Sequence, residues 1–336
     1  MTLFARATAA LLLSAAAAAA QTELTVYTAF EAVDLDRYKK AFETAHPDIT
    51  INWVRDSTGV VTAKLLAEKD NPQADVIWGL AATSLLLMKS EGMLAPFRPE
   101  GIERLDPNFV DQDETPSWVG LDAWIAALCV NTRELERNNL AAPTSWEDLT
   151  KPEYAGHVAM PNPASSGTGF LDVSAWLQMF GEEGGWNFMD RLHQNIKFYT
   201  HSGSKPCKDA ARGEVTIGVS FAFTGAKAIS DGAPLAVVFP SEGSGWDMES
   251  AAIVAETDFR AEAETLLNWA VSEAAMKEYN VGYAVVAIPS VAQPVENYPA
   301  GGLDAMIDND FLWAAENRER ILKEWASRYD GKSEAK

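Results

Sequence analysis

Two short segments of the chain place hydroxyl side chains and glycine directly before a predicted helix. Residues 56–59 read DSTG and residues 165–169 read SSGTG. Backbone N–H groups at a helix start lack intrahelical partners, and together with Ser and Thr hydroxyls they can hold the oxygens of an anion. Ordinary N-capping is the alternative, and it needs only one such side chain. We therefore expect anion binding by Ser57, Thr58, Ser165, Ser166, Gly167 and Thr168.

The pattern around these segments predicts alternating strands and helices. Strands over residues 24–28, 49–54 and 75–78 alternate with helices over 32–45, 60–68 and 85–91. The pattern restarts with strands over 123–131, 158–161, 216–220 and 235–239, and with helices over 169–180, 186–195, 262–271 and 311–325. Such alternation at short intervals favours an α/β fold with a parallel sheet and crossover helices.

The length of the chain predicts two lobes, because 336 residues are too many for one compact core. No low-complexity linker is present, so strands near residues 120–125 and 240–250 are expected to join the lobes. We assign residues 21–122 and 246–336, with the C-terminal helices, to the first lobe and residues 123–245 to the second. This organisation predicts a ligand cleft between the lobes that closes by a hinge motion.

The first twenty residues have the layout of a secretory signal peptide. A short positive start is followed by an apolar run and a tract of alanines that ends at Ala20. A membrane anchor is the alternative, but the apolar run is short and rich in small residues. We expect residues 1–20 to be cleaved and the mature protein to be exported.

The overall charge excludes two classes of partner. Acidic residues outnumber basic ones by 48 to 27, which gives a formal net charge of -21. Nucleic acids and anionic membrane surfaces need clustered Lys and Arg, so neither is expected as a partner. A small anionic ligand stays possible, because helix N-termini bind anions without net positive charge.

The cysteines and histidines give no sign of a metal or catalytic site. The two cysteines, Cys129 and Cys207, most simply form one disulfide in an oxidising compartment. Neither has a histidine or second cysteine at ligand spacing, and the four histidines are scattered. Nucleotide-binding glycine motifs and a G-x-S-x-G elbow are lacking as well. We therefore expect no metal, no cofactor and no enzymatic activity.

Several segments resemble one family of transport proteins. The opening LTVYTAF, the helix end HPDI, the stretch QADVIWGLAATSLLLMKSEGMLAPF and the stretch PTSWEDLTKPEYAGHVAMPNPASSGTGF are similar to bacterial extracellular solute-binding proteins of ABC importers. The similarity runs from about Thr22 to about Trp325. It implies the type II two-lobed periplasmic binding fold, a periplasmic monomer, and an ABC permease and ATPase as partners.

Within this family the chain most resembles the branch that binds 2-aminoethylphosphonate, which is related to ferric-ion binders. The segments INWVRDSTG, NPASSGTGFLDVSAWLQMFGEE, THSGSKPCK and GWDMES carry this likeness. The ferric relatives hold iron largely through two adjacent tyrosines, but residues 217–224 here read IGVSFAFT. Phenylalanine offers no oxygen to iron, so the resemblance favours a zwitterionic phosphonate as the ligand.

The ammonium group of such a ligand needs a carboxylate or an aromatic face. Three acids near the predicted cleft are candidates, namely Glu31, Asp122 and Glu249, with solvated surface acids as the alternative. Trp78, Phe223 and Trp246 are expected to wall the cleft. Ferric ion, a polyamine or thiamine remains an alternative ligand. A periplasmic phosphate-ester hydrolase is the alternative from a different class of protein.

Overall fold

The computed structural model describes residues 21–335, so the predicted signal peptide lies outside the described residues. The first part of the chain alternates as predicted. It contains β1 (Thr22–Thr28), α1 (Ala32–Ala45), β2 (Ile49–Arg55), α2 (Thr58–Ala67), β3 (Val76–Ala81), α3 (Ala82–Ser90) and β4 (Leu94–Ala95). Helix α1 buries Asp34, Tyr38 and Phe42, which are spaced one helical turn apart and face the sheet.

The middle of the chain contains β5 (Val119–Asn131), α4 (Thr132–Asn138), β6 (Val158–Pro161), α5 (Gly167–Asn195), β7 (Ile196–Thr200), α6 (Lys205–Arg212), β8 (Ile217–Phe221), α7 (Ala222–Ser230) and β9 (Leu235–Val238). The two helices predicted over residues 169–195 form one long element with a kink. Gly181 has φ 74° and ψ 168°, a backbone conformation that glycine adopts readily and that interrupts the helix there.

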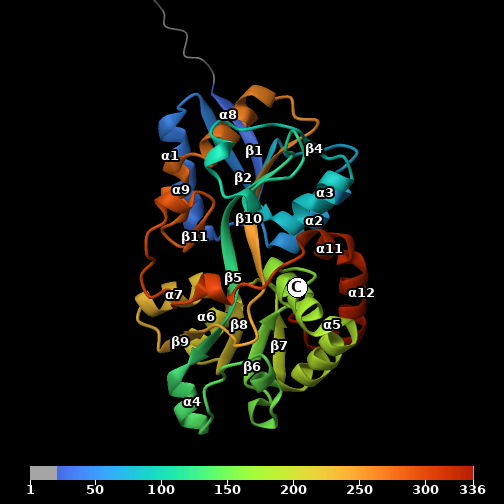
Figure 1. Cartoon of the computed structure of the whole chain (residues 1–336), viewed down its shortest axis with the longest axis vertical. Coiled ribbons are helices and arrows are strands. Elements are labelled where there is room, and N and C mark those ends of the chain that lie inside the picture. Colours follow the sequence, from blue (N-terminus) through green and yellow to red (C-terminus); the bar gives the residue numbers. More distant parts are fainter. Residues whose placement is uncertain (1–20, 336) are drawn as a thin grey trace, which may run out of the picture.

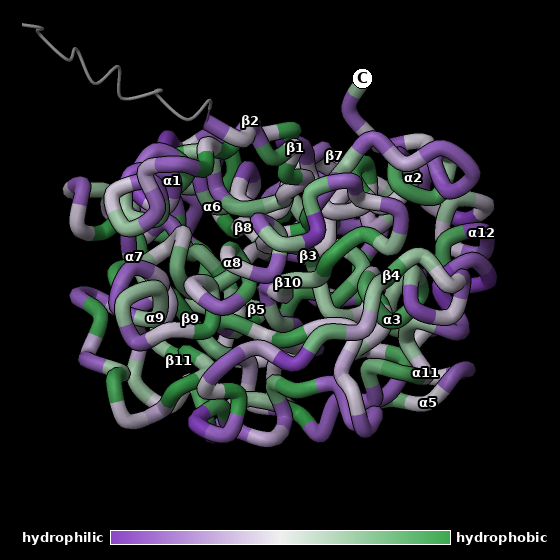
Figure 2. The backbone as a smooth tube through the Cα atoms, turned by 90° about the horizontal axis from the view of Figure 1, so that it is seen from above, coloured by the Kyte–Doolittle hydropathy of each residue, from purple (hydrophilic) through white to green (hydrophobic). Residues whose placement is uncertain are grey.

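The last part of the chain contains β10 (Trp246–Val254), α8 (Arg260–Ala270), α9 (Glu273–Tyr279), β11 (Val285–Val286), α10 (Gly302–Ala305), α11 (Phe311–Glu316) and α12 (Arg318–Tyr329). Within residues 21–335, no helix has the length and apolar character needed to cross a membrane. Seen from above, helices surround the strands, and hydrophobic segments gather towards the inside (Figure 2).

Strand β5 joins two groups of strands. The hydrogen-bonded order is β2-β1-β3-β10-β5-β8-β6-β7, with β4, β9 and β11 at its sides. One half of β5 pairs with β10 and β11, and the other half pairs with β8 and β9. All thirteen residues of β5 are buried, as an apolar central strand requires. In Figure 1, β5 runs through the length of the molecule and connects its two lobes.

Two main hydrophobic cores correspond to the two lobes. The first lobe packs α1, α8 and α9 on strands β1, β2, β3 and β10. The second lobe packs α5 and its neighbours on β5, β6 and β8. Helix α12 joins the second core through Ile321, Trp325 and Tyr329, although the sequence assigned the C-terminal helices to the first lobe. Helix α12 therefore packs in the second lobe rather than the first, because its apolar face lies against α5.

The disulfide predicted between Cys129 and Cys207 is confirmed. It joins β5 to α6, two elements of the second lobe separated by 78 residues in sequence. Around it lies a small third core with Ala159, Ala210 and Val215. The bridge therefore fixes α6, whose preceding loop approaches the start of α5.

Candidate ligand-binding site

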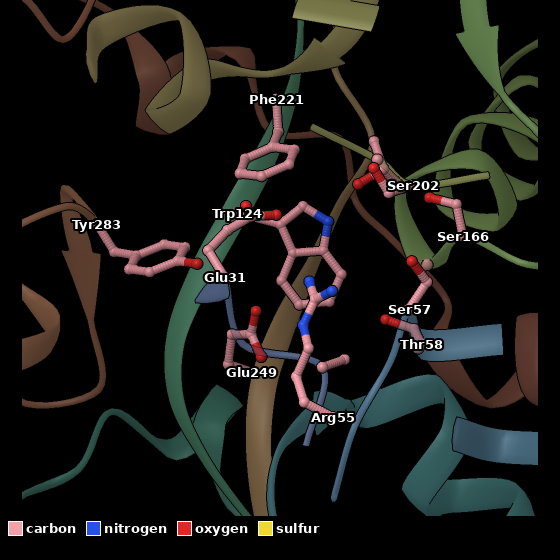
Figure 3. Close-up of a pocket in the computed structure, with 14 residues that line it drawn as sticks. Glu31, Arg55, Ser57, Thr58, Trp124, Ser166, Ser202, Phe221, Glu249 and Tyr283 are labelled. Carbon is pink, nitrogen blue, oxygen red and sulfur yellow. The ribbon is translucent and has the colours of Figure 1, made fainter. Parts of the chain in front are cut away.

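A pocket lies where the two lobes meet. Its lining residues come from the ends of strands and the starts of helices in both lobes: Ala29, Glu31, Arg55, Ser57, Thr58, Trp124, Ser166, Gly167, Thr168, Ser202, Gly203, Phe221, Glu249 and Tyr283. Its volume is about 420 Å³, counting the part open to solvent. Figure 3 shows the polar side chains on opposite sides of Trp124 and Arg55.

One side of the pocket, which we call the hydroxyl end, consists of Ser57, Thr58, Ser166, Thr168 and Ser202. Ser57 is the N-cap residue of α2, but its side chain makes no capping hydrogen bond. Ser166 caps α5 by accepting a hydrogen bond from the backbone N–H of Gly169 at 3.3 Å. Two helix N-termini therefore face one space, and their hydroxyls and N–H groups suit an oxyanion.

The two helix starts touch each other across the lobes. The backbone N–H of Gly59 donates to the carbonyl oxygen of Ser165 at 2.9 Å. A Cβ atom on Gly167 would come within 2.6 Å of the Thr58 hydroxyl. Glycine is needed at this position because any side chain would separate the lobes at the hydroxyl end.

The opposite side of the pocket, which we call the acidic end, consists of Glu31, Glu249 and Tyr283. Within residues 21–335, the Glu249 carboxyl makes no side-chain hydrogen bond and opens into the pocket, while Glu31 pairs with Lys208 of the second lobe at 3.3 Å. Burial, together with the charges of Glu31 and Asp247, raises the pKa of Glu249 to about 8. This end therefore offers hydrogen-bonding groups whose charge depends on their surroundings.

Arg55 and Trp124 lie between the two ends (Figure 3). Arg55 is the last residue of β2 and is held by a hydrogen bond from its Nε to the carbonyl oxygen of Phe30 at 3.1 Å. The indole Nε1 of Trp124 is buried and has no hydrogen-bond partner among the described residues. Both groups are donors that a ligand oxygen could accept from.

The structure brings most of the residues predicted from the sequence into this pocket. Both hydroxyl-rich helix starts and two of the three acids line it: Glu31, Ser57, Thr58, Ser166, Gly167, Thr168 and Glu249. Ser165 lies just behind the pocket, where its hydroxyl donates to the carbonyl oxygen of His201 at 2.8 Å. Its part in the site is therefore to position the neighbouring loop.

Four other predicted residues do not line this pocket. Asp122 is fully buried beneath it. Trp78 is also fully buried, and its Nε1 donates to the Tyr279 hydroxyl at 2.9 Å. Trp246 donates to the carbonyl oxygen of Ile307 at 2.9 Å, and Phe223 lines a separate cavity with Val33 and Val281. The prediction that these four residues line the cleft is therefore wrong for this pocket. The rings of Trp78, Trp246 and Phe223 pack in the hydrophobic cores instead, and Asp122 is buried.

Sequence reasoning missed several lining residues: Ala29, Arg55, Trp124, Ser202, Gly203, Phe221 and Tyr283. Arg55 stands directly before the DSTG segment, and Ser202 and Gly203 precede α6. For Arg55, proximity to a predicted helix start was the signal that could have found it, whereas the helix after Ser202 and Gly203 was not predicted. Tyr283 follows α9 and reaches the pocket only through long-range packing, for which no local pattern exists.

The chain belongs to the bacterial extracellular solute-binding proteins, because the model of this family matches residues 71–314. It is 29% identical over 315 residues to an uncharacterized protein of Haemophilus influenzae, covering 91% of this chain and 90% of the relative. It is 26% identical over 293 residues to the probable ABC transporter periplasmic-binding protein y4fP of Sinorhizobium fredii, covering 85% and 79%. A putative 2-aminoethylphosphonate-binding periplasmic protein of Salmonella paratyphi A is 24% identical over 211 residues, covering 61% and 59%.

Solved structures of the same architecture include AfuA from Actinobacillus pleuropneumoniae with fructose-6-phosphate bound. It has a TM-score of 0.86 and 28% identity, and the match covers 92% of this chain and 99% of AfuA. Iron-bound HitA from Pseudomonas aeruginosa has a TM-score of 0.77 at 20% identity, covering 90% and 99%. The predicted type II two-lobed fold is confirmed by these likenesses.

Proposed function

We propose that the protein captures a small organic phosphate or phosphonate in the periplasm and delivers it to an ABC importer. The observation that carries this proposal is the meeting of two hydroxyl-bearing helix starts, one from each lobe, in one pocket. A phosphoryl group presents several acceptor oxygens, which match the converging hydroxyls and backbone N–H groups. Because the two starts belong to different lobes, an anion between them would stabilise the closed state.

The first candidate for the whole ligand is 2-aminoethylphosphonate. With its phosphonate at the hydroxyl end, its ammonium would point to Glu31 and Glu249 across the pocket (Figure 3). A carboxylate paired with an ammonium forms the strong, charge-assisted type of hydrogen bond. The Salmonella relative supports this candidate through the ligand in its name.

A hexose phosphate is the second candidate, favoured by the likeness to AfuA. Its phosphate would occupy the same hydroxyl end, and its sugar hydroxyls would meet Arg55, Trp124 and Glu249. The two candidates share the phosphoryl group and differ in the charge of the other end. Ferric ion, polyamines and thiamine, the other ligands considered from the sequence, bring no phosphoryl group to the hydroxyl end.

Calorimetric titration of the mature protein tests this function. The ligands are 2-aminoethylphosphonate, fructose 6-phosphate, ethylphosphonate, inorganic phosphate and ferric citrate. We expect one of the first two to bind at least about tenfold more tightly than ethylphosphonate or inorganic phosphate, since only these ligands also reach the acidic end. A preference for ferric citrate, silence with every phosphoryl compound, or turnover of a chromogenic phosphate ester would contradict the proposal.

A further inference from the structure

Glu249 at the acidic end has a second buried carboxyl group, that of Asp122, as its neighbour in the sheet. Asp122 of β5 and Glu249 of β10 are direct partners in the antiparallel ladder. Side chains of such partners stand on the same face of the sheet, with Cβ atoms about 5 Å apart. Trp124 follows Asp122 by two residues and therefore also stands on this face, where it lines the pocket. Asp122 thus lies beside Glu249 on this face but does not line the pocket.

The pair lacks the partners that buried carboxylates normally have. Asp122 has no exposed surface, and neither of its carboxyl oxygens has a hydrogen-bond partner in the described part of the chain. Glu249 is 8% exposed and opens only to the pocket. Two neighbouring carboxyl groups without hydrogen-bond donors cannot both be ionised in such surroundings, because each charge disfavours the other and both lack solvation.

The groups around the pair are mostly acids and phenols. They are Glu31, Asp34 and Tyr38 at α1, Arg55 of β2, Asp247 of β10, and Tyr279 and Tyr283 at and after α9. Arg55 acts on Glu249 directly, whereas Lys208 and Arg37 are paired with Glu31 and Asp34 and compensate part of the neighbouring acidic charge. Burial, then Glu249 and Asp34, raise the pKa of Asp122 well above its ordinary value. The surroundings thus favour a bound proton.

We propose that Asp122 and Glu249 act as one carboxyl pair that keeps at least one proton at neutral pH, with Asp122 as a positioning residue that holds this proton so that Glu249 can ionise towards the ligand. The inference rests on the proposed function only for the identity of the ligand. A cationic group that approaches Glu249 stabilises its ionised form, so the proton leaves to solvent when such a ligand binds. A neutral hydroxyl leaves the proton in place and accepts a hydrogen bond from it. The pair therefore distinguishes ligands by charge, although Asp122 does not reach the ligand.

Infrared spectroscopy of the ligand-free protein tests the pair directly. The band of protonated carboxyl groups is followed from pH 5 to pH 9 in the native protein and in Asp122→Asn, Glu249→Gln and Asp172→Asn. Asp172 is the matched control, because it is equally buried and both of its carboxyl oxygens also lack partners, but burial alone raises its pKa. Glu249→Gln should move the titration of Asp122 to lower pH by about one unit or more, because the neighbouring charge is removed. Asp122→Asn should remove the band that persists to the highest pH and leave the titration of Glu249 in place, because Glu249 ionises beside a neutral carboxyl group. The control should remove its own band and leave the pair's titration in place.

Calorimetry in two buffers of different ionisation enthalpy tests the consequence for binding. Phosphoryl groups themselves titrate near neutral pH, so the contribution of the pair is the difference between the native protein and Glu249→Gln with the same ligand. At pH 7, 2-aminoethylphosphonate should release more protons from the native protein than from Glu249→Gln, and Asp122→Asn should behave like the native protein. Fructose 6-phosphate serves as the neutral-ended ligand and should release equal numbers of protons from the native protein and from Glu249→Gln.

The two experiments separate this inference from the proposed function. If no phosphoryl compound binds but the titration of Asp122 moves in Glu249→Gln, the proposed function fails and the carboxyl pair stands. If Asp122 titrates identically in the native protein and in Glu249→Gln, the pair is wrong whatever the ligand. Ionisation of both carboxyl groups at neutral pH would overturn it equally. Should Glu249→Gln fold poorly, Glu249→Ala removes the same charge and gives the same answer.

Discussion

The two ends of the pocket differ in whether the charge of their hydrogen-bonding groups can change. The hydroxyl end is made of neutral side chains and helix N-termini, Ser57 and Thr58 from one lobe and Ser166 from the other. The hydrogen-bonding capacity of these groups does not change with pH. The acidic end is made of carboxyl groups that come largely from the first lobe, and burial and neighbouring acids set their charge. The difference suggests that one end supplies closure and affinity and the other end supplies selection.

This division also follows the way each end is built. The hydroxyl end uses local structure, because a helix start brings its own N–H groups and capping side chain. The acidic end uses strand pairing, which places Glu249 opposite Asp122 from far along the chain. We therefore expect substitutions at the hydroxyl end to weaken every phosphoryl ligand. Substitutions at the acidic end should separate one ligand from another.

The largest effect is expected from Gly59→Ala, which should prevent closure at the hydroxyl end. A Cβ atom there would lie 2.1 Å from the carbonyl oxygen of Ala164, a contact between backbones of the two lobes that cannot persist. Ligand affinity should fall about 100-fold, measured by calorimetry. The melting curve of the ligand-free variant checks that it is folded. Gly331→Ala is the control, because a Cβ atom at that residue would meet nothing within 4 Å.

Thr58→Val should give the next largest effect. Valine keeps the shape of threonine but removes a hydroxyl that faces the pocket. Loss of one hydrogen bond to a charged phosphoryl group should weaken binding about tenfold to thirtyfold. The loss should be equal for 2-aminoethylphosphonate and for fructose 6-phosphate, if both bind. Thr265→Val on α8 is the control, because it is remote from the pocket and its hydroxyl bonds only to the helix backbone. Unequal losses would contradict a hydroxyl end that reads the phosphoryl group alone.

Glu31→Gln tests the acidic end, where we expect the substitution to weaken only a ligand that carries an ammonium group. The substitution removes a charge at the acidic end and keeps a side chain of the same size. Affinity for 2-aminoethylphosphonate should fall about fivefold, whereas affinity for ethylphosphonate should stay within the error of calorimetry. Lys208→Gln is the matched control, because Lys208 is the partner of Glu31 but does not line the pocket. Equal losses for both phosphonates would show that Glu31 acts on closure rather than on the ammonium.

The same contrast explains what the sequence could predict. The helix starts at Ser57 and Ser166 were found because capping residues and glycine stand together in sequence. Asp122 and Trp124 alternate on one face of β5, but only the packing decides that Trp124 reaches the pocket and Asp122 stays beneath it. Helix α6 was not predicted, although Pro206 at its first turn is a start signal that could have been used. Depth and long-range pairing are not local properties, so the sequence did not reveal them.

The smallest effect is expected from the ion pair at the rim of the hydroxyl end. His201 Nε2 lies 3.3 Å from Asp56 Oδ1, across the lobes, and the two side chains are 45% and 48% exposed. Water screens such a pair, so it contributes at most about 1 kcal/mol. His201→Gln should therefore raise the dissociation constant less than about threefold. This substitution leaves the hydrogen bond from the Ser57 N–H to Asp56 intact.

The comparison between the two ends can be tested because His201→Gln is expected to lower ligand affinity less than Thr58→Val. If the hydroxyl end binds its anion through neutral donors, removing a charge at its rim costs little, whatever the ligand. If His201→Gln instead weakens binding as much as Thr58→Val, closure depends on ionisable groups in both halves of the pocket. Charge would then contribute to affinity at the hydroxyl end as well as to selection at the acidic end. Calorimetry on the two variants with one phosphoryl ligand is sufficient to decide between these outcomes.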